Sequence, residues 1–169
     1  QVLPPIPEWA KAGGDEGAIV LSTRVRVARN LVGELFPGKM SPDDRLRVVK
    51  QSARAIATLE DSERGVFFAL PSLSPVEINV LVERRAISPQ LARDEKPRGV
   101  FLWTDADRAI MICEEDHIRL TEITIGLAPQ KAYHHLAPFL DQLSNVLEFE
   151  HADELGYLTA CPANLGAAV

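Results

Sequence analysis

An acidic segment beside an apolar run is the first place where this sequence could do chemistry. Residues 113–119 read CEEDHIR and follow the apolar residues 109–112. Three carboxylates at this density are costly to bury, so they need partners or a ligand. If one strand continues through the segment, its alternation places Glu115, His117 and Arg119 on one face. A carboxylate and a guanidinium so spaced form either a structural ion pair or part of a functional site.

A second set of charged side chains lies in residues 22–30, which read STRVRVARN. Alternation along a strand places Arg24 and Arg26 on one face, opposite Val25. Together with Arg119, two strands then present three arginines without a matching acidic run. Because a guanidinium can hold phosphate oxygens through two parallel hydrogen bonds, this arrangement favours a phosphate-binding site.

Strands and helices must position these residues, and the sequence predicts both. The predicted strands cover residues 19–28, 66–70, 99–103, 109–113, 118–125 and 157–160, and the predicted helices cover residues 42–60, 75–85 and 129–148. Helices lie between groups of strands rather than after each strand. This order favours an α+β fold with an antiparallel β-sheet flanked by helices.

The first and last predicted helices are amphipathic, so each should bury one stripe of apolar side chains. Ser41 and Pro42 provide a cap and a first helical residue for the helix over 42–60. The expected buried stripes consist of Leu46, Val49, Ala53, Ile56 and Ala57 in one helix and Tyr133, Leu136, Leu140, Leu143 and Leu147 in the other.

The composition excludes several classes of protein. The 169 residues are 46% hydrophobic, which is enough for one domain with a core. Their 18 Lys and Arg against 24 Asp and Glu give a charge of −6, which argues against a general nucleic-acid binder. No apolar run approaches the roughly 18 residues of a membrane span. With only Cys113 and Cys161 and no apolar leader, we expect a cytoplasmic protein without nucleic-acid or membrane partners.

The two ends of the chain differ in character from its middle. Residues 1–17 contain three prolines and three glycines, which predicts an extended N-terminal arm, followed by one domain over residues 18–169. The chain opens on Gln1 and stops at Val169 without a helix stop signal, so we expect a piece of a longer protein.

Metal ligation is the weaker interpretation of the cysteines and histidines. Cys113 and His117 with Cys161 or His151 offer donor atoms for zinc, but the paired cysteine spacing of zinc sites is absent. We therefore predict no metal site built by the chain itself.

Three segments carry a resemblance to a known family: residues 22–30, 113–119 and 155–166, the last reading LGYLTACPANLG. In this order they resemble the successive signatures of the ATP:guanidino phosphotransferases, which include creatine kinases, arginine kinases and bacterial protein-arginine kinases. The match spans about residues 7–169. The short arm and residues 83–89 (ERRAISP) are most similar to the protein-arginine kinase branch.

The resemblance implies part of a guanidino kinase catalytic domain and ATP-dependent phosphorylation of a guanidinium group. The expected acceptor is an arginine residue in a protein, or else a small guanidino compound. ATP and Mg²⁺ are the implied cofactors. The resemblance leaves open whether the longer protein forms a homodimer. By position, Glu115 is the catalytic carboxylate, which holds the guanidinium and accepts its proton, and Cys161 lies beside the guanidino substrate. The implied nucleotide-binding residues are Ser22, Thr23, Arg24, Val25, Arg26, Arg85 and Arg119.

The chain also departs from the family pattern. Cys113 stands where the family usually has asparagine, and Arg85 where it usually has a histidine near the adenine. The family continues beyond residue 169 into an arginine-bearing segment and a second catalytic glutamate, so we expect this chain alone to be inactive. The alternative function is that of a catalytically inactive family member, a regulatory module that binds arginine or phosphoarginine in proteins.

Overall fold

An antiparallel β-sheet organises the chain in the computed structural model, which describes residues 6–10, 19–105 and 107–169. Its strands are β1 (Ser22–Arg29), β2 (Gly65–Ala69), β3 (Gly99–Trp103), β4 (Arg108–Ile112) and β5 (Ile118–Ile125). Within these residues the sheet has five strands in the order β1-β5-β4-β3-β2, and every neighbouring pair is antiparallel. The predicted α+β class is confirmed.

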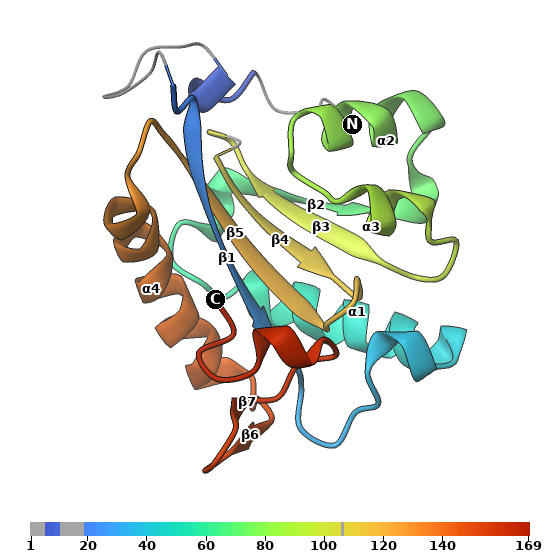
Figure 1. Ribbon diagram of the computed structural model, residues 1–169. Helices are drawn as coiled ribbons and strands as arrows, with labels where there is room; N and C mark the ends of the chain where they lie inside the picture. Colours follow the sequence, from blue (N-terminus) through green and yellow to red (C-terminus); the bar gives the residue numbers. More distant parts are fainter. Residues whose placement is uncertain (1–5, 11–18, 106) are drawn as a thin grey trace.

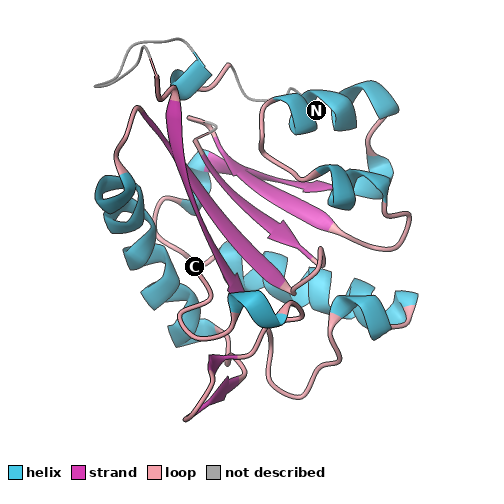
Figure 2. Ribbon diagram, in the orientation of Figure 1, coloured by secondary structure: helices cyan, strands magenta, loops and turns pink. Residues whose placement is uncertain are grey.

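Helices α1 (Pro42–Ile56) and α4 (Pro129–Val146) cover one face of the sheet, behind the strands in Figures 1 and 2. Between them lies the larger hydrophobic core. Trp103 at its centre packs edge-on against Phe101 and Phe139, with ring centroids 4.8 and 5.4 Å apart. We call this side the covered face.

The opposite face is covered only in part. Helices α2 (Pro75–Glu83) and α3 (Pro89–Arg93) pack over β2, β3 and β4 around a second core that contains Phe68, Leu81 and Leu91. No α-helix of the described chain lies over β1 and β5 on this side (Figure 1), although the one-turn 3-10 helix η1 (Glu8–Ala10) contacts β5. We call that area the open half, and it is where Arg24 and Arg26 emerge.

The buried stripes of the two long helices differ from the prediction. Leu46 is 41% exposed and Tyr133 is 44% exposed, so neither belongs to the core. In α1 the stripe is rotated because Arg45 lies on the inner face, where its Nη1 contacts Asp94 Oδ2 at 2.5 Å. Ala57 is also exposed.

Shorter elements complete the fold. The predicted strand over 157–160 is wrong in extent, because only β7 (Gly156–Tyr157) forms, paired with β6 (His151–Ala152). The single-turn 3-10 helices are η1 (Glu8–Ala10), η2 (Pro37–Lys39), η3 (Ser62–Arg64), η4 (Leu70–Ser72) and η5 (Pro162–Asn164). Of the predicted N-terminal arm, residues 1–5 and 11–17 lie outside the described residues. Among the described helices, none has the length and apolar character that crossing a bilayer requires.

Candidate functional site

The acidic segment forms a tight turn between β4 and β5 rather than one continuous strand. The Cys113 N–H donates to the His117 carbonyl at 2.9 Å, and the Glu114 N–H donates to the Asp116 carbonyl at 3.1 Å. Residues 113–117 therefore close a hairpin, and Glu115, His117 and Arg119 do not share one strand face. The turn places two adjacent glutamates at the end of the sheet.

Asn30, directly after β1, fixes this turn. Its side-chain Nδ2 donates to Asp116 Oδ1 at 2.6 Å, and its Oδ1 accepts from the His117 N–H at 2.9 Å. Asp116, which is fully buried, also accepts from the Ala160 N–H at 2.8 Å. These contacts attach the turn to β1 and to the segment before η5.

His117 is a structural residue of the same turn. Its buried ring accepts from the Leu31 N–H at Nδ1 (3.0 Å) and lies 2.9 Å from the Leu35 carbonyl at Nε2. Burial lowers the pKa of His117, which favours the neutral ring with its proton on Nε2. Both nitrogens are thus occupied.

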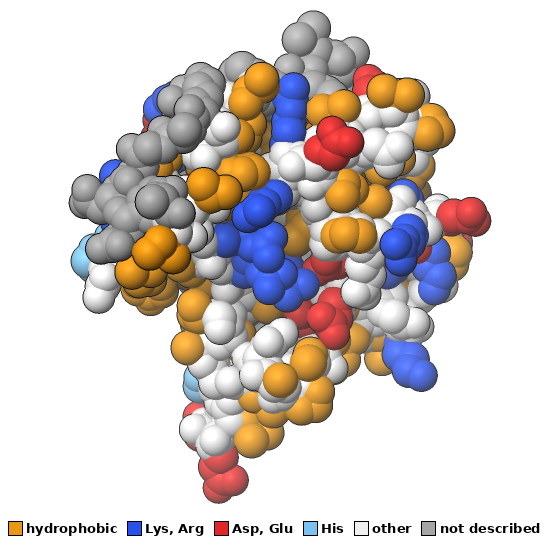
Figure 3. Space-filling view, turned by 45° about the horizontal axis from the view of Figure 1, so that its top comes forward, with side chains coloured by type: hydrophobic (Ala, Val, Ile, Leu, Met, Phe, Trp, Pro, Cys, Tyr) orange, Lys and Arg blue, Asp and Glu red, His pale blue; other side chains and the backbone are white. Residues whose placement is uncertain are grey.

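Three arginines converge on the open half of the sheet. Arg24 and Arg26 come from β1, and Arg119 comes from β5, where it faces Ala28 across the strand pair. Together they line a cavity of about 220 Å³, which we call the arginine cavity. Figure 3 shows basic side chains, coloured blue, gathered in a patch near the middle of the face that this view presents. The remaining lining residues are Val25, Ala28, Asn164, Ala168 and Val169.

The arginines of this cavity repel one another. Partial burial, followed by the positive charges of Arg85 and Arg119, lowers the pKa of Arg24 below its ordinary value. Partial burial, Arg119 and Arg24 lower the pKa of Arg26 in the same way, and Glu114 opposes the effect in both cases. A bound anion would relieve this repulsion, because a guanidinium cluster is stabilised by phosphate-like oxygens.

Glu114 is the carboxylate that faces the arginines. The residue is 5% exposed as a whole and its side chain is 1% exposed, and its Oε2 lies 2.5 Å from Arg119 Nη1. It also accepts a hydrogen bond from the hydroxyl of Ser88, whose Oγ caps α3 by accepting from the Leu91 N–H at 3.0 Å. Sequence reasoning did not foresee either role, although the Ser88-Pro89 pair is a recognisable helix start.

A second cavity, of about 450 Å³, lies on the other side of Glu114, and we call it the carboxylate cavity. Glu115 lines it, is half-buried, and makes no ion pair with any residue that the structure describes. Arg119 lines one cavity and Glu114 the other, so their ion pair joins the two. The lining consists of Phe36, Gly38, Lys39, Arg45, Gln90, Asp94, Lys96, Glu114, Glu115 and Ala160.

The other nucleotide-binding candidates are divided between the two faces of β1. Ser22 and Arg24 share the open face, whereas the Thr23 hydroxyl points away, donating to the Gly126 carbonyl at 2.6 Å and accepting from the Ala128 N–H at 2.9 Å. Val25 is on the other face of β1 from the arginines, but because β1 is an edge strand, Val25 still lines the arginine cavity. Thr23 thus joins β1 to the segment before α4.

Arg85 and the two cysteines lie around the cavities rather than inside them. The Arg85 guanidinium carbon lies 4.9 Å from the centre of the Trp9 ring. The positive charge of Arg85 also contributes to lowering the pKa of Arg24. Cys161 precedes η5 and is half-buried, and its neighbour Ala160 is the residue that lines the carboxylate cavity. Burial raises the pKa of the Cys113 thiol to about 12, so this group stays protonated.

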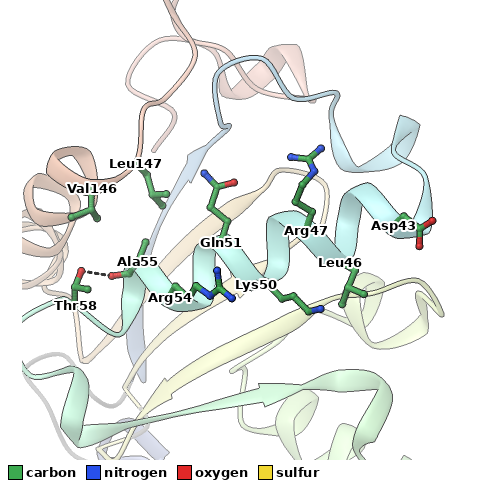
Figure 4. Close-up of a pocket in the computed structure, with 10 residues that line it drawn as sticks. All are labelled: Asp43, Leu46, Arg47, Lys50, Gln51, Arg54, Ala55, Thr58, Val146 and Leu147. Atoms are coloured by element: carbon green, nitrogen blue, oxygen red, sulfur yellow. Dashed lines mark hydrogen bonds between the residues drawn. The ribbon is translucent and has the colours of Figure 1, made fainter.

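A larger cavity, of about 780 Å³, lies away from these residues on the outer face of α1 (Figure 4). Leu46, Lys50 and Arg54 line it together with Val146 at the end of α4, and none of the predicted site residues reaches it. Size therefore does not identify the site here. Within the described part of the chain, no group of three or more His, Cys, Asp or Glu is arranged to hold a metal ion.

Comparison with known proteins finds a family model and curated relatives that match the chain. The model of the family "ATP:guanido phosphotransferase, C-terminal catalytic domain" matches residues 47–169. A protein-arginine kinase of Moorella thermoacetica is 39% identical over 165 residues, covering 96% of this chain and 47% of that protein. A second, of Pelotomaculum thermopropionicum, is 37% identical over 164 residues and covers 95% and 46%. The chain thus spans about half the length of the curated relatives it matches.

Solved structures show the same fold. The duplicated taurocyamine kinase of Schistosoma mansoni with bound transition state analog components superposes with a TM-score of 0.83 at 28% identity, over 99% of this chain and 25% of that one. A lombricine kinase gives a TM-score of 0.78 at 26% identity, over 99% and 50%.

Proposed function

This chain belongs to the ATP:guanido phosphotransferase family, and we propose that it supplies the phosphate-binding arginines and the acceptor carboxylate of a protein-arginine kinase. The reaction is transfer of the γ-phosphoryl group of MgATP to a guanidinium nitrogen of an arginine in a protein. One observation carries the proposal. A cavity with three arginines and a cavity with an unmatched carboxylate share the Arg119–Glu114 ion pair as their common wall.

The arginine cavity suits the phosphoryl donor. In a loose phosphoryl-transfer transition state, charge lies on the equatorial oxygens, and catalysis consists mainly of positioning and charge stabilisation. Arg24, Arg26 and Arg119 would supply that charge from two adjacent strands. Mg²⁺ enters as part of the MgATP substrate, held by phosphate oxygens and water.

The carboxylate cavity suits the acceptor. A guanidinium is protonated at physiological pH and cannot attack phosphorus until it loses a proton. Glu115 would hold the acceptor and take that proton as the nitrogen–phosphorus bond forms and the bond to the leaving oxygen of ADP breaks. Phe36, which is 37% exposed, lines the same cavity, where its ring would contact the guanidinium.

The shared wall supports direct transfer between the two substrates. Glu114 is held by Arg119 and by Ser88 and is therefore not free to act on the acceptor itself. The Asn30 side chain holds the same turn through Asp116 and through the His117 N–H. Rigid support of this kind reduces the entropic cost of bringing donor and acceptor into line.

The alternative, a module that binds phosphoarginine without catalysis, makes a different prediction. Its phosphoryl group would occupy the arginine cavity and its guanidinium the carboxylate cavity without help from a nucleotide. A kinase instead binds its acceptor best when the nucleotide is present and the transferring group is mimicked.

The test measures binding of an arginine-containing peptide to this chain by calorimetry, alone and with MgADP plus nitrate, a planar mimic of the transferring group. We expect nucleotide and nitrate to tighten peptide binding about tenfold or more, about 1.4 kcal/mol. Glu115→Gln should abolish the tightening and leave MgADP affinity within about twofold, since it changes only the acceptor side.

The matched control is Glu63→Gln on the exposed turn η3, which should change neither quantity. Tightening that survives Glu115→Gln would refute the base assignment. MgADP binding without any tightening would refute the kinase proposal, and nucleotide-independent binding of a phosphoarginine peptide would establish the module instead.

A further inference from the structure

Resting on the proposed function, we propose that the acceptor arginine is selected by acidic residues beside it in the substrate protein. Lys39 and Lys96 line the carboxylate cavity, and their ammonium groups would attract those acidic residues. The inference follows from a balance of charge among the side chains around this cavity.

Most charges around the cavity are already neutralised. Arg45, whose side chain is 3% exposed, pairs with Asp94, which is 26% exposed. Glu114 pairs with Arg119 across the shared wall. Among the lining residues these pairs leave one carboxylate, Glu115, and two ammonium groups.

The two lysines come from separate segments that one buried arginine holds together. Lys39 ends η2 and Lys96 follows α3, and both side chains are exposed without an ion pair to any described residue. Arg45 donates from Nε to the Pro37 carbonyl at 3.0 Å and pairs with Asp94, whose Oδ1 accepts from the Lys96 N–H at 2.9 Å. The backbone on both sides of the cavity is therefore fixed.

An acceptor guanidinium that enters this cavity neutralises Glu115, so the two ammonium groups then face the residues that flank the acceptor. They attract carboxylates and repel lysines or arginines. An exposed ion pair changes an equilibrium constant by about 1.4- to 5-fold, so two lysines together give about tenfold. Because the lysines are exposed, salt should weaken the preference.

The experiment uses three capped pentapeptides with a central arginine flanked on each side by aspartate, by glycine or by lysine. Their affinities for this chain are measured with MgADP and nitrate present. We expect aspartate-flanked peptides to bind about tenfold more tightly than lysine-flanked ones, with the glycine peptide between, and the spread to shrink at about 0.5 M salt. N-acetylarginine, which has a free carboxylate, and its amide are measured in parallel. Tighter binding of the acid would show that a single carboxylate on a small guanidino compound is enough to increase the affinity.

The variant Lys39→Glu with Lys96→Glu should invert the order of the peptides. Lys50→Glu with Lys131→Glu, which makes the same charge change on exposed positions of α1 and α4, should preserve it. Equal affinities for all three peptides, or an order that survives Lys39→Glu with Lys96→Glu, would overturn the inference. If the peptides still bind through Glu115 in that case, the proposed function stands. Loss of all Glu115-dependent binding would refute both.

Discussion

Strand β5 contributes one residue to an arginine–glutamate pair on each of its faces, and the two pairs are buried almost equally. On the covered face, Arg108 Nε lies 3.0 Å from Glu122 Oε2. On the open face, Arg119 Nη1 lies 2.5 Å from Glu114 Oε2. Both arginine side chains are 13% exposed, and the glutamates are 5% and 1% exposed. Burial and pairing therefore do not distinguish a structural pair from a pair that belongs to the proposed site.

The surroundings of the two pairs do distinguish them. The Arg108 guanidinium carbon lies 3.8 Å from the centre of the Phe139 ring, and Glu122 also contacts His135 Nδ1 at 3.0 Å. Every charge there has a partner. Around Arg119, by contrast, Arg24 and Arg26 add positive charge that Glu114 alone does not balance. The surplus is what indicates a site for an anion.

The largest effect should come from breaking the balanced pair. Glu122→Gln leaves Arg108 buried without a counter-charge, so the free energy of unfolding should fall by about 3–5 kcal/mol. Urea unfolding followed by circular dichroism measures it. Glu115→Gln is the control, because the same substitution at a carboxylate without an ion pair should cost less than about 0.5 kcal/mol. Equal losses in the two variants would show that Glu122 is not a structural partner.

Removing the arginine of the unbalanced pair should reduce ligand affinity more than stability. In Arg119→Ala, Glu114 keeps the Ser88 hydroxyl and the charges of Arg24 and Arg26, and some repulsion is relieved. Stability should change by less than about 1 kcal/mol, while MgADP affinity should fall about 10- to 150-fold, the value of a charged hydrogen bond.

Arg54→Ala, on the outer face of α1, removes the same charge and should leave MgADP affinity unchanged. If Arg119→Ala unfolded readily but still bound MgADP, the Arg119–Glu114 pair would be structural and would have no part in binding the nucleotide.

The sequence predicted the sheet and the arginine face but not the wall between the cavities. Alternation in residues 22–30 placed Arg24 and Arg26 correctly because β1 is half-buried, with Val27 fully in the core. In residues 113–119 the same argument failed, because a strand and a hairpin turn can both carry this run of polar residues. The contacts that settle it join Asn30 to Asp116 across 86 residues, and no local pattern encodes them.

Helix faces show the same limit. The spacing of apolar residues in α1 fits two neighbouring stripes, and the one containing Leu46 was the wrong choice. Arg45 is on the inner face because Asp94 and the Pro37 carbonyl, both outside α1, accept its hydrogen bonds. A charged residue in a core depends on partners that only the assembled fold provides.

The smallest expected effect concerns Arg85, at the edge of the unbalanced region. Helix α2 ends in a double hydrogen-bond motif in which the Ala86 N–H donates to Leu81 and the Arg85 N–H to Val82. Arg85 has a φ of 57°, a left-handed conformation that favours glycine at this position. Arg85→Gly should relieve about 1–2 kcal/mol of backbone strain and lose about 0.5–1 kcal/mol from the Trp9 ring contact. A net gain of about 0.5–1 kcal/mol in stability should follow.

Arg85→Ala separates the two contributions, because it loses the same charge and ring contact but keeps the strained backbone. The glycine variant should be more stable than the alanine variant by about 1 kcal/mol in urea unfolding. If Arg85 helps to bind nucleotide, both variants should lose MgADP affinity to the same extent, since they lack the same guanidinium. A glycine variant that is more stable but binds MgADP less well would show that the strained Arg85 is retained because its guanidinium contributes to binding. Unchanged MgADP affinity in both variants would remove Arg85 from the nucleotide site and restrict the unbalanced region to Arg24, Arg26 and Arg119.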